Sequence, residues 1–345
     1  MFSLTAKNNI LLALCTVLHF SVDGVCAAVL ASYAVHEPDY SNIVYYFWLY
    51  NFIAFGGQWL TGIFLDKYKK VIVPALAVVP VMLGIGLLNI SILWRAVSVA
   101  VANCLFHVAA GILILERYEN FKEPGIFVSS GAVGLGLGLN RFMGAVTFEV
   151  ICAVFTAIAL FTLIKHHEQQ AHTEQELVSS ENLSFLIAGA LLLLVCVVLR
   201  GFGGKSRLPV HIMLMPCVFM LGKSAGGVVC DMLGYRKTIL AVLLLSFVAL
   251  QIKGTTGAVV LAFAFNMTMP LTLRLLHWYF PENPGLTFGL AAGCLLPGAF
   301  LGNVIKIAPE VMVVIQFISL FVAGVILQRY RSNNQCLSIP HFSQH

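Results

Sequence analysis

Charged residues are scarce in this chain. Of its 345 residues, 10% are Asp, Glu, Lys or Arg, whereas 59% are hydrophobic. Ordinary soluble domains carry about 25% charged residues, and a soluble chain of this length could not bury so much apolar surface. The scarcity therefore excludes a soluble globular protein and indicates a polytopic membrane protein. The net charge of +5 does not indicate a nucleic-acid partner, because the basic residues are scattered through short loops.

The sequence also lacks the common signals of enzymes, metal centres and disulfide frameworks. Eight of the nine cysteines lie inside apolar runs, and no CxxC or Cys/His metal spacing is present. There is no Ser-His-Asp order, phosphate loop or dinucleotide fingerprint. We therefore expect a protein that is not an enzyme and that has no cofactor and no resident metal.

Long apolar runs, by contrast, are abundant. A spanning helix needs about 20 mostly apolar residues. The first run is too long for a signal peptide, so we interpret it as an uncleaved span. We expect twelve spans, at 9–35, 42–65, 71–90, 93–115, 125–143, 146–164, 183–203, 208–231, 238–252, 256–276, 285–304 and 309–328.

The longest polar connection, 165–182, is rich in His, Glu and Gln and divides these spans into two groups of six. A solvated linker explains it better than a metal site does. The predicted fold is thus all-α, with one six-helix bundle at 1–164, a cytoplasmic linker at 165–182, a second bundle at 183–331 and a cytoplasmic tail at 332–345.

The distribution of Lys and Arg predicts the orientation. Lys67, Lys69 and Lys70 follow the second span, and Arg236 and Lys237 follow the eighth. With the amino terminus inside, the inner segments hold more basic residues than the outer ones, as the positive-inside rule requires. We expect a multi-pass protein of the cell membrane, monomeric and surrounded by lipid, with both termini in the cytoplasm.

One loop pattern occurs once in each half. Gly62 is followed four residues later by Asp66 and then by basic residues, and Gly227 is followed in the same way by Asp231. The two aspartates lie 165 residues apart (231 − 66). A second pattern, Pro-Gly at 124–125 and again at 284–285, repeats at an offset of 160 (284 − 124). Two repeats at nearly the same offset indicate a duplicated membrane unit, the usual architecture of secondary transporters.

On these residues the chain resembles the major facilitator superfamily, whose signature loop between the second and third helices has a glycine, an aspartate four residues on and basic residues. The second copy is the closer match because it keeps Gly234, Arg236 and Lys237; in the first copy Tyr68 and Lys69 depart from the pattern. The resemblance implies two bundles around a central cavity, with the first and fourth helices of each half lining it.

A finer resemblance concerns the first half. His19-Phe-Ser-Val-Asp23 and Phe106-His107 are similar to elements of the fosmidomycin-resistance branch of drug exporters, although Val108 stands where that branch has proline. His19 and Asp23 share one helix face at a spacing of four residues. Polar residues at membrane depth are usually functional, so we interpret Asp23, His19 and His107 as a proton-coupling group. The alternative is a buried polar cluster that only joins helices.

Other polar residues in the spans are candidates for substrate binding: Asn103, Lys223, Arg200 and Asn266. Lys223 could instead extend towards the inner helix end and pair with Asp231. The loop residues Asp66, Lys67, Asp231, Arg236 and Lys237 are candidates for gating, since an aspartate can cap a neighbouring helix; they could also serve only to set orientation.

Together these features predict a proton-coupled secondary active transporter of a small organic solute that works by alternating access. Efflux is slightly favoured over uptake. The alternatives are an uptake symporter for an organic anion and a transporter-like receptor that binds a solute without moving it.

Overall fold

The computed structural model describes residues 4–140, 145–166, 183–203 and 211–334, and every regular element within them is a helix. The first half contains α1 (Leu4–His36), α2 (Tyr40–Asn51), the π-helical turn η1 (Phe52–Gly56), α3 (Gln58–Lys67), the 3-10 turn η2 (Lys69–Val71), α4 (Ile72–Leu87), α5 (Ile92–Arg117), α6 (Lys122–Asn140) and α7 (Ala145–His166). The second half contains α8 (Leu183–Gly203), α9 (Leu214–Leu233), α10 (Tyr235–Gln251), α11 (Gly254–Tyr279), α12 (Pro284–Gly293), α13 (Leu295–Val304) and α14 (Pro309–Asn334).

The described helices make up twelve spanning units, which confirms the predicted fold. Eight of them have by themselves the length and mean hydropathy needed to cross a bilayer. Two predicted spans differ from expectation because each is interrupted in the middle. One is α2–η1–α3, and the other is α12–α13, which breaks at Cys294. Pro297 cannot donate to the carbonyl of Gly293, four residues earlier, and this explains the second break.

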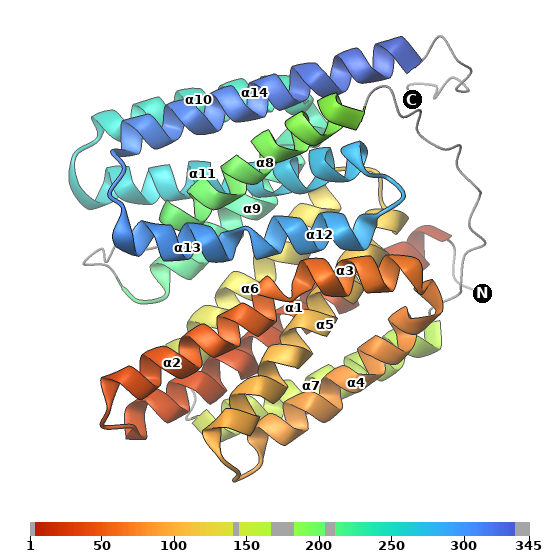
Figure 1. Cartoon of the computed structure of the whole chain (residues 1–345), viewed down its shortest axis with the longest axis vertical. Helices are drawn as coiled ribbons and strands as arrows, with labels where there is room; N and C mark the ends of the chain where they lie inside the picture. Colours follow the sequence, from red (N-terminus) through yellow and green to blue (C-terminus); the bar gives the residue numbers. More distant parts are fainter. Residues whose placement is uncertain (1–3, 141–144, 167–182, 204–210, 335–345) are drawn as a thin grey trace.

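The two halves form separate bundles that lie against each other (Figure 1). Within the first half α1 packs on α5, α6 and α7, and α4 packs on α5 and α7. Within the second half α8 packs on α11, α13 and α14, and α10 packs on α11 and α14. The halves meet along α6 with α9 and along α3 with α12. Helices far apart in the sequence therefore form the inter-half surfaces.

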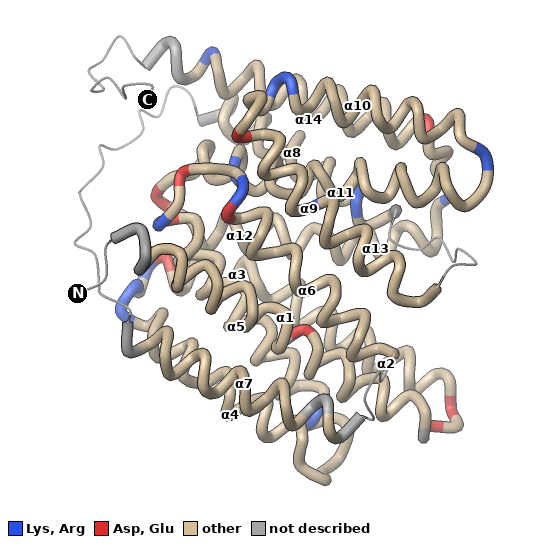
Figure 2. The backbone as a smooth tube through the Cα atoms, turned by 180° about the vertical axis from the view of Figure 1, so that it is seen from behind, with Lys and Arg blue, Asp and Glu red and all other residues tan. Residues whose placement is uncertain are grey.

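The beginning of α1 and the end of α14 lie on the same side of the molecule, which we call the terminal side (Figure 1). Charged residues gather at helix ends, and most of the length of the bundles carries none (Figure 2). This is the pattern expected of helices surrounded by lipid. The proposed linker falls largely on 167–182 and the proposed tail largely on 335–345; both ranges lie outside the described residues.

Candidate functional site

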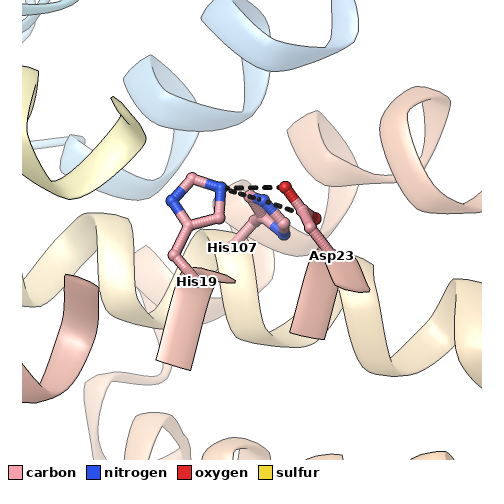
Figure 3. A group of neighbouring side chains, drawn as sticks. All are labelled: His19, Asp23 and His107. Atoms are coloured by element: carbon pink, nitrogen blue, oxygen red, sulfur yellow. Dashed lines mark hydrogen bonds and ion pairs between the residues drawn. The ribbon is translucent and has the colours of Figure 1, made fainter. Parts of the chain in front are cut away.

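Two histidines and an aspartate from two helices meet in the first half. His19 and Asp23 are one turn apart on α1, and His107 is on α5. The Nε2 atoms of His19 and His107 are 2.8 Å apart. The carboxylate of Asp23 lies 3.3 Å from the His19 Nε2 and 3.5 Å from the His107 Nε2. Figure 3 shows these side chains pointing toward one another. We call His19, Asp23 and His107 the triad.

The tautomers of both triad histidines follow from their backbone partners. The His19 Nδ1 is 2.8 Å from the carbonyl oxygen of Phe127, and the His107 Nδ1 is 2.8 Å from that of Asn103. A carbonyl oxygen can only accept, so each Nδ1 carries a hydrogen. In two neutral rings, both Nε2 lone pairs would then face each other at hydrogen-bonding distance. A cation between them removes this repulsion, and a single shared proton, balanced by the Asp23 carboxylate, is sufficient.

The surroundings of the triad hold it in place. The Asn103 amide donates from Nδ2 to the Asp23 Oδ1 at 2.9 Å. Gly131 of α6 lies against the triad: a Cβ atom there would stand 2.3 Å from the Asp23 Oδ2 and 2.4 Å from the His19 Nε2. The Asp23 side chain is 16% exposed, compared with 6% and 7% for His19 and His107. Access to the triad is therefore through Asp23, and Asn103 positions that carboxylate.

The triad also has the donor set of a metal site. One nitrogen from each histidine and one carboxylate oxygen all lie within 4.8 Å of one another. Spacing along the chain could not indicate this set, because His107 is 88 residues from His19. The sequence analysis grouped these three residues for proton coupling, through the resemblance to drug exporters, but expected no metal there.

Lys223 of α9 reaches across to the other half. Its Nζ donates to the carbonyl oxygen of Val128 on α6 at 3.1 Å. Val128 follows Phe127, whose carbonyl holds His19, so consecutive residues of α6 hold the triad and this lysine. The described residues contain no ion pair between Lys223 and Asp231, whose oxygens accept from backbone N–H groups.

Arg200 of α8 is a buried cation, and one of its guanidinium nitrogens has no hydrogen-bond partner among the described residues. It is 8% exposed, and its Nη1 donates to the Thr272 Oγ1 at 3.2 Å. Its Nη2 is buried without a partner among the described residues. The Asn266 amide donates to its own helix, at the Ala262 carbonyl. Among the described substrate-binding candidates, Arg200 is thus the one with a buried side-chain nitrogen that has no hydrogen-bond partner.

The two repeated aspartates cap helices of the opposite half. Asp66, at the end of α3, accepts from the backbone N–H groups of Gly285 and Leu286 at 2.8 Å each, where α12 begins. Asp231, near the end of α9, accepts from Phe121 at 2.8 Å and Lys122 at 2.9 Å, where α6 begins. A helix amino terminus has unpaired N–H groups and a positive dipole end, which favour a carboxylate.

The glycine that precedes each aspartate permits this approach. A Cβ at Gly62 would stand 2.2 Å from the carbonyl oxygen of Gly285, and a Cβ at Gly227 would stand 2.5 Å from that of Phe121. Any side chain at either position would therefore push the halves apart. Each glycine–aspartate repeat thus lies against a Pro-Gly repeat of the other half, although Asp66 accepts from Gly285 itself and Asp231 accepts from residues just before Pro124-Gly125.

Arg274 of α11 is a residue whose role sequence reasoning missed. It is 1% exposed, and its guanidinium donates to three carbonyl oxygens between α5 and α6: Leu115 at 3.2 Å, Tyr118 at 2.5 Å and Asn120 at 3.1 Å. Arg274 lies close to the end of a predicted span, where an arginine is usually interpreted as an orientation signal. The sequence therefore did not indicate this contact. We call Asp66, Asp231 and Arg274, with the backbone groups they hold, the inter-half clamp.

The other predicted gating residues lie outside the clamp. Lys67, Arg236 and Lys237 are exposed. The Lys67 ammonium lies over the Tyr68 ring at 5.3 Å, and the Arg236 guanidinium lies over the Tyr235 ring at 5.8 Å. The structure thus separates the aspartates, which join the halves, from the basic residues that follow them.

On the side opposite the termini, the described residues include apolar contacts between the halves. The rings of Trp48 and Phe300 meet at 5.4 Å, and Gly136 lies against Pro216. The two sides of the molecule therefore differ in the chemistry that joins the halves.

Comparisons with known proteins agree with this geometry. No protein-family model matches the chain, and no curated protein matches it in sequence. Solved structures do match. FucP, a major facilitator superfamily transporter in the outward conformation, is 13% identical with a TM-score of 0.60, covering 93% of this chain and 98% of FucP. A variant of the E. coli fucose:proton symporter FucP is 12% identical with a TM-score of 0.58, covering 93% and 98%.

A bacterial homologue of the iron transporter ferroportin, in an outward-facing state, is 13% identical with a TM-score of 0.59, covering 94% of this chain and 99% of that protein. At these identities the similarity is one of fold. The chain has the twelve-helix fold of major facilitator transporters.

Proposed function

We propose that the chain is a proton-coupled secondary active transporter that works by alternating access. One observation carries the proposal: two histidines, each with its Nδ1 held by a carbonyl, direct their Nε2 atoms at each other beside a carboxylate at membrane depth. Such a site is completed by a proton and becomes unfavourable without one. FucP, a fucose:proton symporter, shares the fold, which supports the coupling.

Helix α6 gives a physical route from the proton to the movement of the halves. Its first turn is capped by Asp231 of the second half, and its Phe127 carbonyl holds His19. Loss of the shared proton would leave the two lone pairs facing each other and would force one ring to turn. A turn of His19 breaks its bond to α6, the helix that the clamp holds. We infer that the clamp closes the terminal side, which faces the cytoplasm, and that it opens when α6 shifts.

The cargo we propose is a small organic solute with an anionic or strongly hydrogen-bonding end. Lys223 is a half-buried cation on α9, and Arg200 is a buried cation on α8. In the described part of the chain, no carboxylate forms an ion pair with either cation. Buried charge needs a counter-charge, and an anionic cargo would supply it. We still favour efflux slightly. The alternative is uptake, in which the protein would be a symporter for an organic anion.

A proteoliposome assay tests the function. The full chain is reconstituted with a pH-sensitive dye inside, and a panel of organic solutes is added while an imposed pH gradient is recorded. We expect some solute to dissipate the gradient and to be moved against its own gradient. Asp23→Asn should abolish uphill movement but retain downhill exchange. His211→Asn, at an exposed histidine before α9, is the matched control and should behave as wild type.

Two results would contradict the proposal. Uphill movement at the wild-type rate in Asp23→Asn would remove the triad from coupling. A solute that binds, as shown by a thermal shift, but never crosses the bilayer would favour a receptor.

A further inference from the structure

We propose that the triad is also a binding site for a divalent transition-metal ion such as Zn²⁺, which takes the place of the shared proton. The ligands would be the Nε2 atoms of His19 and His107 and one carboxylate oxygen of Asp23. The inference concerns the same triad as the proposed function, but it requires no transport.

The first argument is that a backbone carbonyl oxygen fixes the tautomer of each histidine ring. Histidines that bind metals almost always donate their other ring N–H to a carbonyl or carboxylate, which leaves a lone pair aimed at the ion. Here both Nδ1 atoms face carbonyl oxygens at 2.8 Å. The Asp23 carboxylate is oriented in turn by the Asn103 amide at 2.9 Å. Each ligand therefore already has the outer partner that a metal site needs.

The second argument is the spacing of the ligand atoms. Zinc bonds of about 2.0–2.1 Å in tetrahedral geometry place neighbouring ligand atoms about 3.3 Å apart. The Asp23 Oδ2 lies 3.3 Å from the His19 Nε2 and the Oδ1 lies 3.5 Å from the His107 Nε2, so each ring has one carboxylate oxygen near that spacing. The two Nε2 atoms, at 2.8 Å, are closer, as expected of a pair that shares a proton. A metal would need these rings to separate by about half an ångström.

The third argument is access and charge. Asp23 is the partly exposed member of the triad, so an ion can enter on that side and a water can complete the coordination. Binding exchanges one ion for another: the metal enters, both Nε2 lone pairs bond to it and the shared proton leaves to solvent. The net charge at the site rises by one, and no other reactant is needed. Because the proton has left, a bound metal blocks the proton-coupled step.

The experiment uses the full-length protein in lipid nanodiscs. Zn²⁺ binding is followed by calorimetry in two buffers of different protonation enthalpy, and Co²⁺ binding by its visible absorption. We expect one metal ion per chain, one proton released per metal and a cobalt spectrum typical of nitrogen and oxygen ligands. His107→Gln and Asp23→Asn should each weaken Zn²⁺ binding by at least about tenfold, since the loss of an outer partner alone costs about 10–100-fold. His211→Asn should bind as wild type.

Gly131→Ala provides a second test, because its methyl group would occupy the space beside Asp23 and His19 while all three ligands remain. It should also weaken Zn²⁺ binding. No saturable Zn²⁺ binding in the wild type, or a cobalt–thiolate absorption band, would overturn the inference. Equal affinity in wild type and in both ligand variants would overturn it too.

The outcomes separate the two proposals about the triad. Metal binding without proton release would preserve the metal site and contradict the shared proton. Proton-coupled transport that depends on Asp23, in a protein that binds no Zn²⁺, would preserve the function and contradict the metal site.

Discussion

Removing the charge of Asp66 should open the contact between the halves on the terminal side. Asp66 belongs to the first half, yet it caps the amino terminus of α12 in the second through two hydrogen bonds of 2.8 Å. Asp66→Asn keeps the size of the side chain and one acceptor oxygen but loses the charge and the second acceptor. One of the two backbone N–H groups, of Gly285 or of Leu286, then loses its partner in the other half.

The magnitude follows from the contact. Loss of a helix cap costs about 0.5–2 kcal/mol, and the helix dipole contributes about 0.3–1 kcal/mol to the preference for a charged cap. Since one acceptor remains, we expect a loss of about 1–2 kcal/mol for the closed arrangement. That corresponds to a rise of about 5- to 30-fold in the population of the open one.

Hydrogen exchange followed by mass spectrometry measures this change directly. If the clamp works as one unit, Asp66→Asn should speed exchange of two distant sets of amides. One is its own pair, Gly285 and Leu286; the other is Phe121 and Lys122, which Asp231 holds. Asp39→Asn is the matched control: Asp39 caps α2 within its own half, on the opposite side, and should affect neither set.

The pattern of exchange decides between gating and simple capping. Faster exchange confined to Gly285 and Leu286 would show that Asp66 only holds the end of α12. Unchanged exchange at both sets would show that the bond contributes nothing to closure. Either result would refute a clamp that opens as a unit.

Three further predictions concern single side chains. Arg274→Lys should lower the free energy of unfolding by about 1–3 kcal/mol, because one ammonium replaces a guanidinium that holds three carbonyls and about two bonds are lost; an unchanged melting temperature would contradict this. Lys223→Gln should weaken binding of an anionic ligand by about 1–3 kcal/mol and spare its matched neutral analogue; equal losses for both would make Lys223 structural. The Tyr33 hydroxyl, bonded at 2.5 Å, lowers the pKa of Glu37 in the loop before α2. The stability it contributes is therefore present above the ordinary glutamate pKa of about 4.3 and is lost as the pH falls further, so melting curves of Glu37→Gln should lack this acid-dependent loss.

The sequence determined the number of helices and the two-fold repeat. Spanning length and apolar composition are local properties, so each predicted span could be found without its neighbours. The spacing of His19 and Asp23 also fixed their shared helix face, because the α-helical turn places residues four apart on one side. The repeated glycine–aspartate and Pro-Gly patterns marked two helix ends correctly, but nothing in them showed that each aspartate caps the other half.

Tertiary structure decided which side chains meet. In a soluble helix the apolar stripe identifies the buried face, whereas a helix in lipid is apolar on nearly every side, and its rotation about its own axis is set by packing. The contact of His107 with His19, the bond from Lys223 to Val128 and the three carbonyls held by Arg274 all depend on that rotation. The break at Cys294 could be anticipated from Pro297. The three triad residues were grouped for proton coupling only through the resemblance to drug exporters; the facing Nε2 atoms arise where two helices cross, and composition and spacing alone did not indicate them.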